Sequence, residues 1–487
     1  MFKKTTIAAA LTTTALAGFF SCSRKWDDHN QVQDPNTTIN LYNEIAGNTT
    51  LSKFKSYLDL TGYADTLKLS QNYTVWAPTD AALQAVDAAL NADKDKMKVF
   101  VAHHITRQKY FTTDVQATSK RLPMLDGKYV YFSSTKFDQA AITTADKFRA
   151  NGVLHIISEA AAPVANVWNY VDTLKTTGQF NMASYLKAQE YDYFDSTKAI
   201  QTGVDADGRP VYQPGTGIIK RNRYIDRVAT LNDESKEYTV FIVANTSWDA
   251  ERTKLKPYYA TSTTDSTNEL TSWNTAKDLV MEGSYAPDQL PDSVTSKYGV
   301  KTVIKKSAIQ FAIRTSNGYV YVMNEMNVAL KAKLPQFVIQ GENPSFYSNS
   351  VGNWIFYRTL VNPNTGKTFS DLFVYDHRIN KFYVGYRISG VYTVKYKVYW
   401  VVANNNRFTN TFSQRLAIGT STNTTFAYST ISPNVYDELY LGEYTVSSYG
   451  SGNLSLYLIS ADIAPTTSNQ SSNSLFLDYV RLEPVIP

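Results

Sequence analysis

The chain of 487 residues contains two short sequence boxes, and each of them occurs twice in the same order. The first box, YTVWAPTD at residues 73–80, returns as YTVFIVAN at residues 238–245. The second box, NGVLHII at residues 151–157, returns as NGYVYVM at residues 317–323. The spacing between the two boxes is nearly the same in both copies. The distance along the chain from the first copy of the boxes to the second is that of a whole domain, so the sequence predicts two tandem copies of one module.

Each box has the pattern of a structural element. The first box alternates like a strand until Pro78 ends it. Thr79 or Asp80 can then cap a helix that begins near Ala81, where apolar residues follow at helical spacing. The Asn-Gly pair of the second box suits a tight turn that leads into a buried strand. Neither box contains a nucleophile, a general base or a phosphate-binding loop, so the repeat indicates a structural module.

The paired boxes resemble those of fasciclin domains, which are extracellular modules of adhesion and surface proteins. The first copy also contains LPMLDG at residues 122–127, which is similar to the central motif of that family. The family's Tyr-His motif corresponds to His103 and His104, so its tyrosine is missing, and the second copy has no histidine in the matching region. The resemblance implies two α+β domains, at residues 38–166 and 172–333, of which the second is degenerate and carries insertions.

The beginning of the chain has the pattern of an export signal. The sequence opens with MFKK, and residues 7–20 form an apolar run that is too short to span a membrane. Cys22 is the only cysteine, so it can form no internal disulfide, and its position after Ser21 resembles a bacterial lipobox. We therefore expect a lipoprotein signal peptide at residues 1–21, lipidation at Cys22 and a tether at residues 22–37. The alternative is an ordinary signal peptide with an incidental cysteine.

The lipobox resemblance implies a membrane location. Acyl chains on Cys22 would anchor the protein, because each buried methylene contributes about 0.8 kcal/mol. The following SRKWDDHN at residues 23–30 resembles the acidic, tryptophan-containing openings of surface lipoproteins of the Bacteroidetes. This resemblance implies export to the outer face of the outer membrane, whereas a plain polar tether is the alternative.

From residue 335 to residue 487 the sequence changes to short alternating segments separated by turns. The clearest is YTVKYKVYW at residues 392–400, in which tyrosine, valine and tryptophan fall on one face and threonine and lysine on the other. About eight to ten such segments predict an all-β sandwich, of jelly-roll type. The closing LDYVRL at residues 477–482 resembles the last strand of carbohydrate-binding-module sandwiches.

A carbohydrate-binding sandwich would need exposed aromatic rings on which sugar rings stack, with polar groups beside them for the hydroxyls. The domain is rich in aromatic residues, but those that face inward would only fill its core. We select Trp354, Tyr399 and Arg407 as candidate ligand-binding residues. Asp205, Asp207 and Gly208 resemble the start of a calcium loop, yet the distal ligands are absent, so a hairpin turn is expected and no metal site.

The expected function is non-catalytic binding at the cell surface. The resemblances imply an outer-membrane lipoprotein that accompanies a SusC/SusD-type nutrient importer and binds a glycan or the transporter. The alternative is an adhesion or matrix protein that acts through its fasciclin-like modules. Neither an enzyme nor a cofactor is expected, since the chain contains no nucleophile elbow, zincin helix or phosphate loop. The net charge of +5 is dispersed, which excludes nucleic acid as a partner.

Overall fold

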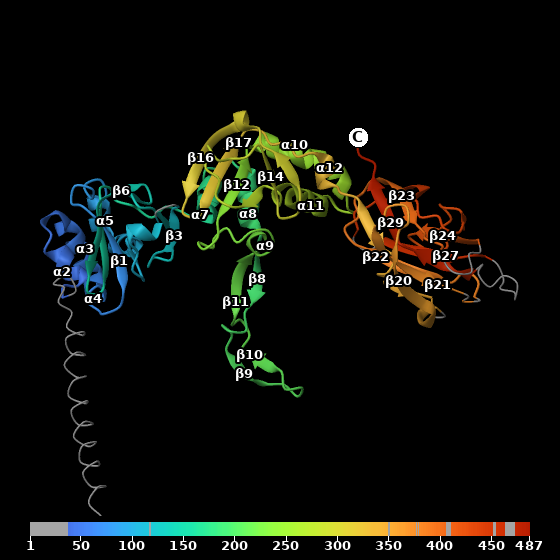
Figure 1. Cartoon of the computed structure of the whole chain (residues 1–487), viewed down its shortest axis with the longest axis horizontal. Coiled ribbons are helices and arrows are strands. Elements are labelled where there is room, and N and C mark those ends of the chain that lie inside the picture. The colour runs from blue at the N-terminus through green and yellow to red at the C-terminus, as the bar shows by residue number, and fades with distance from the viewer. Residues whose placement is uncertain are drawn as a thin grey trace, which may run out of the picture. The chain divides into compact units, whose positions relative to one another are not determined.

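The computed structural model describes residues 38–115, 118–348, 351–375, 377, 379–405, 411–450, 454–462 and 473–487 (Figure 1). Cys22, the signal peptide and the tether lie outside these residues, as does Arg407. The chain forms two compact units. The first contains residues up to Tyr170 with Leu231–Glu237 and Arg314–Gly318, and the second contains Val171–Thr230, Tyr238–Ile313 and Tyr319–Pro487.

The first unit is built on a sheet in which the two boxes lie side by side. Strand β1 (Tyr73–Pro78) pairs in parallel with β7 (Gly152–Ile157), with Tyr73 opposite Gly152. A Cβ atom at Gly152 would lie 2.0 Å from the carbonyl oxygen of Tyr73, so only glycine fits there. Both strands are buried along their whole length. The boxes therefore form a pair of adjacent, buried strands in the sheet of the module.

The remaining elements of the first unit extend this pair and cover it. The sheet order is β2-β1-β7-β6-β5-β4-β3. The added strands are β2 (Ile105–Thr106), β3 (Lys120–Pro123), β4 (Tyr129–Phe132), β5 (Lys136–Phe137) and β6 (Ala140–Arg149). The helices are α2 (Leu41–Ala46), α3 (Ser52–Thr61), α4 (Tyr63–Thr66), α5 (Asp87–Ala92) and α6 (Lys94–His103).

The helix that the sequence predicts near Ala81 begins later. Residues 80–86 form turns, and α5 starts at Asp87. The Thr79 hydroxyl does accept the backbone N–H of Ala82, at 3.2 Å. The Asp80 carboxylate instead accepts hydrogen bonds from Ser52 and from the backbone N–H of Lys53, so it belongs to the start of α3.

The second copy repeats the arrangement of the boxes. Its sheet has the order β13-β12-β17-β16, so the strands of its two boxes, β12 (Tyr238–Val243) and β17 (Gly318–Met323), are again neighbours. The other strands of this module are β13 (Val280–Glu282), β14 (Ser293–Thr295), β15 (Lys301–Val303) and β16 (Ile309–Thr315). Its helices are α7 (Val167–Thr176), α8 (Asn181–Ala188), α9 (Arg223–Arg227), α10 (Asn245–Leu255), α11 (Thr264–Ala276) and α12 (Leu330–Lys333).

Two segments of the second copy differ from what their sequences suggest. The pattern of residues 180–194 predicts one helix, but α8 ends at Ala188 and a strand starts at Glu190. The run TSTTDST at residues 261–267 predicts a solvent loop, but α11 begins within it. Thr263 caps this helix, because its hydroxyl oxygen accepts a hydrogen bond from the backbone N–H of Ser266. The hydroxyl of Thr267 donates a hydrogen bond to the backbone carbonyl of Thr263. Local hydrogen bonds thus let threonine-rich sequence enter a helix.

A hairpin arm at residues 190–222 separates α8 from α9 and extends away from the body of the second module (Figure 1). At the base of the arm, β8 (Glu190–Phe194) pairs with β11 (Ile218–Asn222). At its tip, β9 (Gln201–Val204) pairs with β10 (Pro210–Tyr212). The hairpin turn predicted at Asp205 is confirmed, because the backbone N–H of Asp205 donates to Arg209 and Gly208 has φ of 77°.

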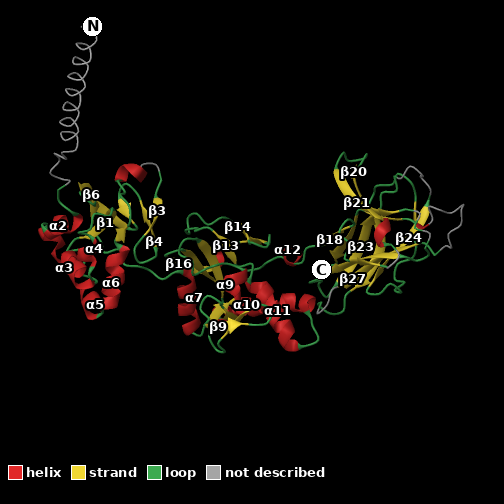
Figure 2. Cartoon of the chain, turned by 90° about the horizontal axis from the view of Figure 1, so that it is seen from below, coloured by secondary structure: helices red, strands yellow, loops and turns green. Residues whose placement is uncertain are grey.

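From β18 onward Figure 2 shows mainly strands, which confirms the predicted β-sandwich. The sheet orders are β18-β29-β23-β26, β19-β22-β27-β24-β25 and β20-β21-β28. The first sheet contains β18 (Phe337–Gln340), β23 (Lys395–Val401), β26 (Leu439–Thr445) and β29 (Tyr479–Pro484). The second contains β19 (Phe346–Tyr347), β22 (Tyr383–Ile388), β24 (Phe412–Ile418), β25 (Ser429–Ile431) and β27 (Leu454–Ser460). The third contains β20 (Ile355–Val361), β21 (Thr368–Val374) and β28 (Leu475–Leu477).

The predicted two-faced strand at residues 392–400 is confirmed over its C-terminal part. Tyr396, Val398 and Trp400 are buried in the core, while Lys395 and Lys397 are exposed. The regular strand begins at Lys395 rather than at the start of the predicted segment. This inward-facing row belongs to the same buried cluster as the inner residues of the five-stranded sheet, so the core lies between the sheets.

Candidate functional site

A pocket of about 660 Å³ lies against the five-stranded sheet of the sandwich. Its floor includes Tyr383 of β22, Ile459 of β27 and Arg415 of β24. These three residues form one row across the sheet, because Ile459 pairs with both Tyr383 and Arg415. The wall and rim of this sandwich pocket consist of Lys381, Ser421, Thr422, Thr424, Phe426, Ala427, Tyr428 and Asp462.

The floor of the pocket points away from the core because the strands alternate. In β22 the side chains of Val384 and Tyr386 are buried in the sandwich, so Tyr383 points to the opposite face. In β24 Leu416 is buried in the same core, which places Arg415 on the pocket side. The alternation of side chains along these strands therefore places one set of residues in the sandwich core and the other set on the outer face of the five-stranded sheet.

Further aromatic rings adjoin Tyr383 on this face. The ring centroids of Tyr383 and Tyr457 are 5.3 Å apart, and that of Phe346 lies 5.2 Å from Tyr457 and 6.2 Å from Tyr383. Gly385 makes this packing possible, since a Cβ atom there would lie 2.2 Å from the Phe346 ring. The three rings form a continuous aromatic surface beside the pocket.

Arg415 is held in a fixed position by the loop above it. Its two terminal nitrogens donate to the backbone carbonyls of Asn423 (2.9 Å) and Ser421 (3.1 Å). Its guanidinium lies 5.3 Å from the ring centroid of Tyr428, whose hydroxyl donates to the carbonyl of Ser460. The guanidinium of Arg415 and the ring of Tyr428 are thus already ordered, which reduces the conformational entropy that these side chains would lose when a ligand binds.

An ion pair forms the opposite rim of the pocket. The Lys381 ammonium lies 2.7 Å from the Asp462 carboxylate, which also accepts a hydrogen bond from the amide of Asn380. These contacts, above all the one with Lys381, lower the pKa of Asp462, so this group is ionised at neutral pH. Both side chains are about half exposed and can exchange this pairing for contacts with a bound ligand.

The pocket offers binding groups rather than an acid–base pair. Among its described lining residues Asp462 alone carries a carboxylate, whereas glycoside hydrolysis normally uses two. Flat aromatic faces beside hydrogen-bond donors and acceptors are instead what a sugar ring requires.

Two of the three sequence-predicted ligand residues lie within the described residues, and both lie outside this pocket. Trp354 ends a single 3-10 turn before β20, is 43% exposed, and has its ring 5.5 Å from that of His377. Tyr399 lies on β23, where the guanidinium of Arg481 is 4.0 Å from its ring centroid. Neither residue lines the sandwich pocket, and the third candidate, Arg407, lies outside the described residues.

The histidines noted in the sequence lie within the first unit. His103 Nδ1 is 2.7 Å from Asp126 Oδ2, and both side chains are buried. Burial lowers the pKa of His104 to about 3, and its Nδ1 contacts the carbonyl of Phe100. Burial also lowers the pKa of His155, whose Nε2 contacts the carbonyl of Tyr110. In the part of the chain that the structure describes, no three His, Cys, Asp or Glu side chains are arranged to hold a metal ion.

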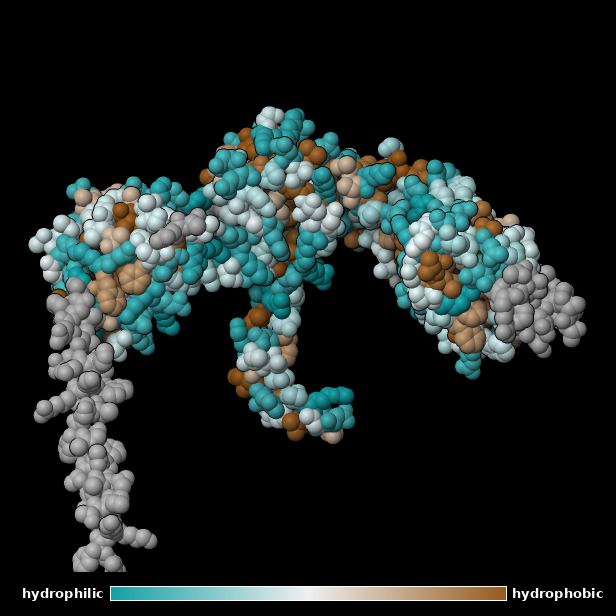
Figure 3. All heavy atoms as spheres, in the orientation of Figure 1, coloured by the Kyte–Doolittle hydropathy of each residue, from teal (hydrophilic) through white to brown (hydrophobic). Residues whose placement is uncertain are grey.

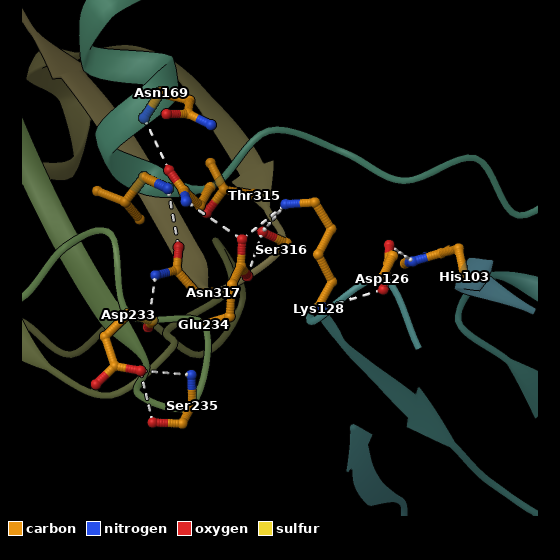
Figure 4. A network of polar contacts seen from close by, with 12 residues as sticks. His103, Asp126, Lys128, Asn169, Asp233, Glu234, Ser235, Thr315, Ser316 and Asn317 are labelled. Carbon is orange, nitrogen blue, oxygen red and sulfur yellow. Dashed lines mark hydrogen bonds and ion pairs between the residues drawn. The ribbon is translucent and has the colours of Figure 1, made fainter. Parts of the chain in front are cut away.

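The His103–Asp126 pair adjoins a polar network (Figure 4). Asp126 Oδ1 accepts the backbone N–H of Lys128, and the Lys128 ammonium lies 2.7 Å from Glu234. The second oxygen of Glu234 accepts the hydroxyl of Ser316 at 2.7 Å. The histidine at the family's motif position is therefore part of an internal network of the first unit.

Comparisons with known proteins agree with this architecture. The fasciclin domain family matches residues 49–163, so the chain contains a fasciclin domain. Protein sll1483 of Synechocystis sp. is 28% identical over 128 residues, which are 24% of this chain and 70% of that protein.

Among solved structures, the chain is similar to a FAS1 domain pair from the insect cell adhesion molecule fasciclin I. The identity is 15%, the coverage is 59% of this chain and 99% of that one, and the TM-score is 0.24. It is also similar to a family 35 carbohydrate-binding module from Clostridium thermocellum, at 13% identity, covering 31% of this chain and 99% of that one with a TM-score of 0.21. Because both TM-scores are low, the fold description rests on the sheet topology and on the family match.

Proposed function

We propose that this protein is a non-catalytic binding protein that captures a glycan in the sandwich pocket. The observation that carries the proposal is the row formed by Tyr383, Ile459 and Arg415 on the outer face of the five-stranded sheet, closed by Tyr428 and the Lys381–Asp462 pair. Tyr383 and Arg415 lie on the side of the sheet opposite the sandwich core, while Ile459 between them is buried.

The chemistry of the pocket fits a sugar ring at each point. The apolar face of a pyranose can stack on Tyr383, and its edge can contact Tyr428. Its hydroxyls can donate to Asp462 and accept from Lys381 or Arg415, since vicinal hydroxyls pair well with charged groups that present several donors or acceptors. A cavity of about 660 Å³ can hold one or two such rings.

The cellular setting belongs to the same proposal. Lipidation at Cys22 would hold the protein on the outer membrane, and a SusC/SusD-type transporter would receive the captured nutrient. The lipobox pattern and the following tryptophan-containing segment support this setting. None of the helices within the described ranges combines the length and hydropathy that a membrane crossing needs.

The proposal is tested by screening the full chain on a glycan array and by pull-down with purified outer-membrane transporters. A variant with Tyr383→Ala and Arg415→Gln should lose glycan binding. Tyr357→Ala is a matched control, because Tyr357 is 55% exposed on the same sandwich but does not line the pocket. Blank results in both experiments would reject the proposal. Cell or matrix binding that survives in the double variant would instead favour adhesion through the fasciclin-like modules.

A further inference from the structure

The hairpin arm at residues 190–222 is an addition that its module does not need. In both copies an asparagine at the start of the second box accepts the first backbone N–H of the opening helix, at Leu41 in one copy and at Val167 in the other. The stretch from that helix to the strand of the first box is more than twice as long in the second copy, and the arm accounts for most of the difference. Since the first copy closes its fold without an arm, the arm is available for another role.

The register of the arm gives its base two different faces. Tyr191 and Tyr193 share one face with Arg221 and Ile219, because these residues pair directly across the ladder. That face is covered by the protein's own cations: the guanidinium of Arg221 lies 4.4 Å from the ring centroid of Tyr193, and that of Arg223 lies 5.8 Å from the ring centroid of Tyr191.

On the opposite face, here called the open face, the Phe194 ring contacts the Tyr212 ring of the arm's own tip, with 5.1 Å between the ring centroids. The ladder places Asp192 opposite Lys220 and Phe194 opposite Ile218 on this side. Phe194 is 45% exposed and Ile218 is 51% exposed. Figure 3 shows apolar residues in brown along the arm. A two-stranded hairpin is only marginally stable by itself, so an apolar pair that stays about half exposed is a site where a partner would stabilise it.

The charges of the open face restrict which partner fits. Asp192 and Lys220 form an ion pair of 2.6 Å across the ladder, and their side chains are 59% and 69% exposed. The face thus carries the Asp192–Lys220 pair at one level of the ladder, the two apolar side chains at the next, and Glu190 opposite Asn222 on the other side of the ion pair. Such a face can be complementary to itself, which is the requirement for an interface with two-fold symmetry.

One face-to-face arrangement brings each charge opposite its counter-charge. With the two-fold axis parallel to the strands, β8 of one copy lies over β11 of the other. Asp192 then faces Lys220 of the second copy, and Phe194 faces Ile218. With the axis perpendicular to the strands at the height of this pair, Asp192 would face its own equivalent, which brings like charges together. We propose that the open face of the arm is a dimer interface with a second copy of this chain, and that the strands of the two arms run in the same direction.

Charge reversal tests this arrangement directly. Asp192→Lys alone places lysine opposite lysine in the dimer, and Lys220→Asp alone places aspartate opposite aspartate. When the two variants are mixed, both contacts become complementary again. Sedimentation velocity of the purified full chain should therefore show a dimer for the wild type, at least tenfold weaker association for each variant alone, and restored association in the equimolar mixture.

Asp207→Lys is the matched control, since it makes the same charge change in the exposed turn at the tip of the arm. It should leave the dimer intact. Both test positions lie on the exposed arm, so the circular dichroism spectrum should show that the rest of the fold is kept, and the restored association on mixing separates the interface from any loosening of the arm. A monomeric wild type at high micromolar concentration, or variants that dimerise alone and gain nothing on mixing, would overturn the proposal. Binding of the wild-type arm to a different protein, without self-association, would also overturn it.

Discussion

Asn151 and Asn317 form the same three hydrogen bonds in their respective copies. Asn151 accepts the N–H of Leu41 and donates to the carbonyls of Leu67 and Leu69. Asn317 accepts the N–H of Val167 and donates to the carbonyls of Leu231 and Asp233. In each copy one side chain therefore ties the start of the first helix and the loop before the first box to the second box. This is the physical reason why asparagine opens that box twice.

Replacing Asn151 by alanine should destabilise the first module by about 3 kcal/mol, because three hydrogen bonds are lost at a buried position and their backbone partners are left unsatisfied. Urea unfolding followed by the fluorescence of Trp76, which is buried in this module, would measure the change. Asn151→Asp keeps the acceptor for Leu41 but loses both donors, so it should also destabilise. A stability equal to that of the wild type in the alanine variant would contradict the assigned role.

Asp278→Ala should destabilise the second module by about 3–5 kcal/mol, because it leaves a buried lysine without its counter-ion. The Lys333 ammonium lies 2.6 Å from Asp278, and the side chains of both residues are almost fully buried. Differential scanning calorimetry would show the loss as a lower melting temperature. The exposed pair Lys305–Glu325 provides the control, since Glu325→Ala should change stability by less than about 1 kcal/mol. Equal effects of the two substitutions would contradict this expectation.

The stability of the sandwich should fall as the pH rises toward about 7. Burial, together with the nearby carboxylates of Asp371 and Glu342, raises the pKa of Asp478 to about 7. In the unfolded state Asp478 releases its proton near the lower, ordinary pKa of an aspartate. The protonated carboxyl therefore stabilises the folded state fully below that ordinary pKa. This contribution is lost as the pH rises to the pKa of the folded state, where the buried carboxyl ionises. Asp478→Asn should flatten the dependence of the melting temperature on pH in this window. An unchanged slope would show that another group is responsible.

The sequence predicts the fold best where one physical requirement dominates. The strand of the first box follows from alternation that ends at Pro78, and that of the second box follows from an apolar run after an Asn-Gly turn. The row Tyr396, Val398 and Trp400 also follows from alternation. Prediction fails where local hydrogen bonds compete with composition. Thr267 lies in a helix because its hydroxyl bonds a backbone carbonyl one turn earlier, a choice that the threonine-rich composition does not show.

The candidate pocket is harder to predict than the fold. Trp354 and Tyr399 belong to different parts of the sandwich, and neither lines the pocket. Tyr383 and Tyr428 are among many aromatic residues of the domain, and only the strand register shows which of them share the outer face with Arg415. The position of Asp462 beside Lys381 depends on two loops that are far apart in the sequence.

The most direct test of the glycan-binding proposal is calorimetric titration of the full chain with the strongest glycan found by the array. The account predicts that Tyr383→Ala weakens binding at least tenfold, or by about 1.4 kcal/mol, while Tyr357→Ala leaves it unchanged. Equal affinity of the wild type and the Tyr383→Ala and Arg415→Gln variants would show that the sandwich pocket is not the binding site and would contradict the account.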